Sequence, residues 1–116
     1  MADFSTSKNE FNMQKLSAEM EQYCKNNNIE VRIFAQMLLV TEEYLTNILF
    51  PNFDGGVEIS VSNTDKGILL YFFHTGADYM NKITDNSFLS LKILQNKTKE
   101  MKSYAKDGGA AAEFLL

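Results

Sequence analysis

The chain has 116 residues, of which 45% are hydrophobic and 22% are charged, and its formal net charge is -4. These proportions are close to globular averages, so the sequence predicts one folded domain over residues 1–116 and excludes a wholly disordered chain. Because the 11 Lys and Arg residues are scattered, the basic patch of a nucleic-acid-binding protein is missing, and we expect no nucleic-acid partner.

Two helices are predicted in the first half of the chain. Residues 1–9 show no clear pattern, and we expect a poorly ordered tail there. From about Glu10 to Lys25, apolar residues recur at three- and four-residue steps, which is the spacing of one helical face. A second stripe of this kind runs from Glu30 to about Leu49, and Pro51 provides its stop.

A pair of strands is predicted next. Val57, Ile59 and Val61 alternate with polar residues, as in a half-buried strand. Residues 68–74 are almost continuously apolar, which predicts a central strand covered on both faces. Residues 75–87 carry little periodicity and are long enough to form a functional loop.

The remaining residues predict one helix and two closing strands. Either Ser87 or Asp85 can cap the helix. Residues 99–106 and 110–116 are predicted strands that flank the turn signal Asp107-Gly108-Gly109. This order predicts an α+β fold, in which a two-layer α/β sandwich places the helices on one face of a mostly antiparallel sheet.

Glu43 and Asn47 form the clearest candidate site. They lie four residues apart in the second predicted helix, and this spacing puts both side chains on one helical face. A carboxylate in a cavity can act as a general base, and an amide oxygen can hold Mg²⁺. The same pair also occurs on ordinary solvated helix faces, so the spacing alone leaves both interpretations open.

With its element order and its Gly108-Gly109 turn, the chain resembles the histidine-kinase-like ATPase (GHKL) superfamily, and within it the anti-sigma factor and serine-protein kinase type. In that family a Glu precedes an Asn by four residues in a helix directly before the central hairpin, where Glu43 and Asn47 stand. The resemblance implies the histidine-kinase-like ATPase fold. It also implies that Glu43 is the catalytic base and that Asn47 binds Mg²⁺ and ATP.

The family's Asp-x-Gly-x-Gly motif corresponds to residues 74–78 of this chain, where only Gly76 agrees. His74 replaces the Asp that accepts a hydrogen bond from adenine. A neutral imidazole has one acceptor, whereas a carboxylate has two oxygens. The resemblance therefore makes His74 and Gly76 candidate adenine contacts with altered chemistry.

The family's Gly-x-Gly-Leu motif corresponds to residues 86–89, where both glycines are absent. Asn86 and Ser87 open this segment, and Phe88 adds a side chain where the backbone would have to approach the phosphates closely. A helix N-terminus still attracts anions. Asn86 and Ser87 are therefore the candidate phosphate contacts, at a weakened site.

These observations predict a cytoplasmic protein with no membrane partner, since the N-terminus lacks a signal-peptide pattern and no apolar run could span a membrane. The resemblance implies signal transduction and transcription regulation through a protein partner, a sigma factor or an anti-sigma antagonist, with ATP and Mg²⁺ binding weak or lost. An active site would make it an ATP-dependent protein serine/threonine kinase. The family's first two helices also allow a homodimer.

The alternatives are a non-enzymatic interaction module on the same fold, binding another small ligand or none, and an isolated helper of a two-component system.

Overall fold

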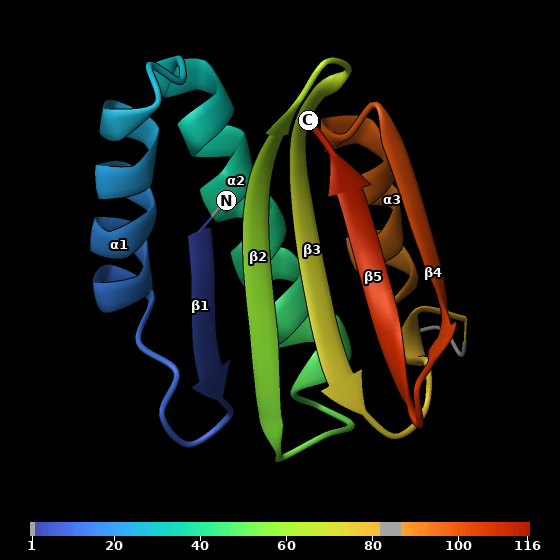
Figure 1. Cartoon of the computed structure of the whole chain (residues 1–116). Helices are drawn as coiled ribbons and strands as arrows, with labels where there is room; N and C mark the ends of the chain where they lie inside the picture. Colours follow the sequence, from blue (N-terminus) through green and yellow to red (C-terminus); the bar gives the residue numbers. More distant parts are fainter. Residues whose placement is uncertain (1, 82–86) are drawn as a thin grey trace.

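The chain folds into a helical layer packed on one face of a sheet (Figure 1). The computed structural model describes residues 2–81 and 87–116. In that part of the chain the strands are β1 (Ala2–Ser7), β2 (Gly56–Thr64), β3 (Gly67–Thr75), β4 (Glu100–Lys106) and β5 (Gly109–Leu115). The helices are α1 (Met13–Asn26), α2 (Val31–Tyr44) and α3 (Phe88–Lys97), with a π-helical segment η1 (Leu45–Leu49) and a 3-10 turn η2 (Tyr79–Asn81).

The sheet has the strand order β1-β2-β3-β5-β4, and every neighbouring pair is antiparallel. Strand β3 is therefore the central strand, and β1 and β4 form the two edges. This arrangement confirms the predicted α+β class, with helices on one face of an antiparallel sheet. The turn between β4 and β5 has positive φ at Asp107 and Gly108, as the Asp-Gly-Gly signal predicted.

Strand β1 corrects the expectation that residues 1–9 form a poorly ordered tail. It pairs with β2 along its whole length, and Phe4 lies opposite Ile59. Phe4 also packs against the hydrophobic core. A strand of six residues with only one large apolar side chain gives too little periodicity for the pattern to be seen in the sequence.

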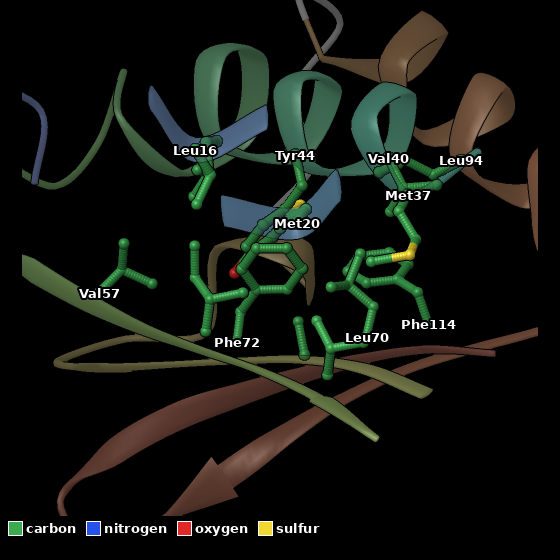
Figure 2. Packing of buried hydrophobic residues seen from close by; sticks show 14 of the residues in the cluster. Leu16, Met20, Met37, Val40, Tyr44, Val57, Leu70, Phe72, Leu94 and Phe114 are labelled. Carbon is green, nitrogen blue, oxygen red and sulfur yellow. The ribbon is translucent and has the colours of Figure 1, made fainter. Parts of the chain in front are cut away.

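The core lies between the helices and the inner face of the sheet, as Figure 2 shows. The ring of Tyr44 in α2 lies 4.8 Å from that of Phe72 and 5.5 Å from that of Phe114, measured between centroids. Met20 of α1 and Met37 of α2 are also fully buried. The predicted apolar stripe of α1 is thus its buried face. In α2 the buried residues are Met37, Val40, Thr41 and Tyr44, whereas Val31, from the predicted stripe, is 81% exposed.

Strand β3 corrects a second expectation, namely that residues 68–74 are covered on both faces. Its side chains alternate strictly in burial: Phe72 and His74 face the helices and are buried, whereas Tyr71 and Phe73 lie on the outer face and are half-buried. The three described helices all pack on the inner face. The run is continuously apolar because the outer face also carries apolar side chains, although no described helix covers them.

No helix in residues 2–81 and 87–116 is both long and apolar enough to cross a membrane.

Candidate functional site

The elements that carry the predicted site residues converge at one end of the molecule, at the bottom of Figure 1. There α2 continues into η1, β3 ends, and α3 begins. Segment η1 lies against η2, and α3 packs against α2. The fold therefore brings the segments that hold Glu43, Asn47, His74, Gly76 and Ser87 to the same end of the helical layer.

Glu43 is half-buried in the last turn of α2, and Asn47 is exposed within η1. The hydrogen bond that defines η1 runs from the N–H of Phe50 to the carbonyl oxygen of Leu45, at 2.8 Å. A π-helical turn is wider than an α-helical one, and such turns are frequent at functional sites. The α-helical spacing that predicted a shared face for Glu43 and Asn47 therefore ends at Tyr44.

His74 is enclosed by protein on the inner face at the end of β3. Only 2% of its surface is exposed. Its ring centroid lies 4.8 Å from that of Phe53 and 5.7 Å from that of Tyr79, which is nearly parallel to it. Its Nε2 is 2.8 Å from the carbonyl oxygen of Ala77. Because a carbonyl oxygen only accepts hydrogen bonds, Nε2 carries a proton and donates it.

When the ring is neutral, this bond leaves Nδ1 of His74 as its acceptor. Nδ1 is buried and has no hydrogen-bond partner among the described residues. The hydroxyl of Thr41, fully buried in α2, likewise has no hydrogen-bond partner among the described residues. An unsatisfied buried polar atom costs about 1 to 3 kcal/mol, so Nδ1 is an acceptor that a donor group could satisfy.

The turn after β3 is held by its own polar groups. Gly76 has φ of +95°, which favours glycine, and its N–H donates to the carbonyl oxygen of Gly108 at 3.3 Å. The Oδ1 of Asp78 accepts the N–H groups of Met80 and Asn81 at 3.0 and 3.3 Å. Its Oδ2 accepts the side-chain amide of Asn81 at 2.7 Å. The carboxylate therefore already caps η2.

Tyr44 is a site residue that the sequence analysis missed. It is almost fully buried, and burial raises the pKa of its hydroxyl, with a smaller contribution from the negative charge of Asp78. The hydroxyl is thus kept neutral near that carboxylate. Phe53 and Tyr79, the two rings beside His74, were missed as well, because each is an isolated aromatic residue and nothing in the sequence shows that it will lie against an imidazole.

The start of α3 is only partly described. Ser87 occupies the N-cap position, and Asn86 lies outside the described residues, as does Asp85, the other predicted cap. Phe88 and Leu89, in the first turn, are 55% and 70% exposed. This end of the molecule therefore presents apolar side chains to the surface.

In residues 2–81 and 87–116, no group of three or more His, Cys, Asp or Glu side chains is placed to hold a metal ion. The sole histidine is enclosed as described above, and the sole cysteine, Cys24, is buried with its Sγ 3.6 Å from Sδ of Met37.

Comparison of the sequence with models of known protein families found no match, and comparison with curated proteins found none either.

Proposed function

We propose that this chain is a regulatory domain of the histidine-kinase-like ATPase type, similar to anti-sigma factors and serine-protein kinases, that acts by binding a protein partner. In this proposal ATP binding is weak or lost. The observation that carries it is the enclosure of His74, the residue at the position where the family binds adenine, between Phe53 and Tyr79.

The described residues do not fit ATP in the family's manner. The family's carboxylate offers two free acceptor oxygens to adenine, whereas Nε2 of His74 already donates to Ala77. Asp78, four residues later, cannot replace it because both of its oxygens accept hydrogen bonds from η2. A purine would also have to displace one of the rings that flank His74. We therefore derive no phosphotransfer step for Glu43.

A protein partner is supported by the surface beside the same site. Phe88 and Leu89 are adjacent in the first turn of α3 and more than half exposed. Exposed apolar side chains that lie together are typical of docking sites for other proteins. A partner of the sigma factor or anti-sigma antagonist type would bind here through apolar contacts and would need no nucleotide.

Calorimetric titration with ATP and ADP, with and without Mg²⁺, tests the nucleotide half of the proposal. We expect no binding heat up to millimolar nucleotide, because His74 offers adenine a single enclosed acceptor, Nδ1, and both oxygens of Asp78 are occupied. The Asn47→Ala variant should behave in the same way, since Asn47 would hold no Mg²⁺. Magnesium-dependent binding by the native chain that Asn47→Ala weakens would contradict the proposal and identify a working kinase site.

One observation favours the alternative of an interaction module that binds a different small ligand. Nδ1 of His74 is a buried acceptor without a partner among the described residues. A neutral ligand with an N–H or O–H donor could satisfy it without displacing the bond from Nε2 to Ala77. Such a ligand would perturb the imidazole, whereas a partner bound only to Phe88 and Leu89 would not.

A further inference from the structure

The outer face of the sheet carries an apolar centre that no described helix covers. Leu69, Tyr71 and Phe73 of β3 and Leu115 of β5 lie there and are half-buried. A strand with apolar side chains on both faces is normally buried on both. In the described part of the chain, all helices lie on the opposite side (Figure 1). The side chain of Lys106 reaches over the ring of Tyr71, with its Nζ 5.1 Å from the ring centroid, and the rest of this apolar centre is open to a second surface.

Both flanks of this face carry a hollow. Over β1 and β2, Ser5, Gly56 and Glu58 line a hollow of about 460 Å³. On the opposite side, Glu100, Lys102 and Glu113 line a smaller hollow of about 200 Å³. Tyr104 of β4 also lies on that side, and its hydroxyl donates a hydrogen bond to Glu113. Both flanks therefore have room for side chains of a facing surface.

The charges of the two flanks differ. Asp3 and Glu58, both exposed, lie on the β1 flank. Lys102 and Lys106, also exposed, lie on the β4 flank. That flank also carries Glu113, which Tyr104 and Lys102 contact, and Glu100, at the opposite end of β4 from Lys106. The β1 flank is therefore acidic, whereas the β4 flank supplies ammonium groups that an acidic surface can face.

Sheet register places the complementary residues at equal heights. One row across the strands begins at Asp3 on β1 and ends at Lys102 on β4, and it passes through Tyr71 on the central strand. The next row begins at Ser5 and ends at Tyr104. Asp3 and Lys102 therefore stand at opposite ends of one row, and Ser5 and Tyr104 stand at opposite ends of the next.

We propose that two copies of this chain associate face to face through the outer faces of their sheets, related by a two-fold axis parallel to β3. Such an axis keeps the height of every row and exchanges the two flanks. It places Asp3 opposite Lys102 of the second copy and Ser5 opposite Tyr104 of the second copy. Each contact occurs twice, as in any isologous dimer. The apolar centres on β3 meet at the axis and cover one another.

Charge selects this axis over the other two-fold arrangement of facing sheets. An axis perpendicular to the strands would place β1 over β1 of the second copy, so that the carboxylates of Asp3 and Glu58 would gather on one side. Like charges placed opposite each other disfavour an interface. Packed sheets are rotated by about 30°, which shifts the edge strands by roughly 5 Å, within the reach of a lysine side chain.

The available area is sufficient for a specific dimer. Five strands about 4.8 Å apart, each with about seven residues of about 3.3 Å, give a face of roughly 24 by 23 Å before side-chain relief is counted. A standard interface buries about 800 Å² on each partner. The open face, about 550 Å² before side-chain relief, lies just above the lower limit of about 500 Å² on each partner. This dimer differs from one formed through the first two helices and does not depend on the proposed function.

Sedimentation equilibrium of the full chain over a micromolar to millimolar range tests the proposal by charge exchange. Lys102→Glu and Asp3→Lys should each raise the dimer Kd by about tenfold, since each change turns two opposite-charge contacts into two repulsions. The double variant Asp3→Lys/Lys102→Glu restores both contacts with reversed sign and should return the Kd towards that of the native chain.

Lys97→Glu, an equal change of charge at an exposed position at the end of α3, is the matched control and should leave the Kd unchanged. Asp3, Lys97 and Lys102 are all exposed, so far-UV circular dichroism should show native folding in all four variants. A chain that is monomeric at every concentration would overturn the proposal. A dimer Kd that neither single charge reversal changes would also overturn it. So would a double variant whose Kd does not return towards that of the native chain.

Discussion

Replacing Phe72 by alanine is expected to destabilise the domain by about 3 to 5 kcal/mol, which is the usual cost of removing a buried aromatic side chain. Phe72 is fully buried on the inner face of β3. Its ring packs against Tyr44 at 4.8 Å and against Phe114 at 5.7 Å. Because small domains are stable by only about 5 to 15 kcal/mol, the urea midpoint followed by circular dichroism should fall by a large fraction.

Phe73→Ala is the matched control for this prediction, because Phe73 is the same residue type at the next position of the same strand. It lies on the outer face and is half-buried. At low protein concentration, where the chain is monomeric, we expect a loss well below that of Phe72→Ala. Equal losses for the two variants would contradict the assignment of the core to the inner face.

Gly109→Ala should cost about 1 to 3 kcal/mol, the range found for overpacking in closely packed regions. A Cβ atom at Gly109 would collide with the carbonyl oxygen of His74 and would lie 2.8 Å from Cζ of Phe73. Strands β3 and β5 would have to move apart at the end of β3 where His74 sits. Thermal unfolding by calorimetry measures the loss.

Gly108→Asn is the matched control for the glycine prediction. Gly108 has φ of +78°, and a Cβ atom there would have open space around it. Asparagine adopts positive φ more readily than most residues, so we expect a loss below about 1 kcal/mol. If both glycine variants were equally stable, the close approach of β3 and β5 would be contradicted.

Much of the fold could be predicted because its periodic elements are long. The apolar stripe of α1, the presence of α2 and the alternation in β2 follow from spacing alone. Strand β1 was missed because Phe4 is its only large apolar residue. The open face of β3 was missed because the same run of apolar residues can be covered by its own chain or by a partner.

The sequence predicted where the candidate site lies, but not the hydrogen bonds and ring contacts that its residues make. Spacing identified Glu43 and Asn47 and placed His74 at the end of a strand. It could not show that the helix changes to π-helical hydrogen bonding at Leu45, because that depends on tertiary packing of the turn. Nor could it show that Tyr79, five residues after His74, stacks on the imidazole.

The most direct test of the proposed function is a ¹⁵N NMR spectrum of the imidazole, recorded while ATP and Mg²⁺ are added to millimolar concentration. His74 is the only histidine in the chain, so its signals need no assignment. We predict the Nε2–H tautomer, with ring shifts that nucleotide does not change. A saturable change in those shifts that requires Mg²⁺ and disappears in Asn47→Ala would show that the site binds ATP, and it would contradict the proposal of a partner-binding domain with a lost nucleotide site.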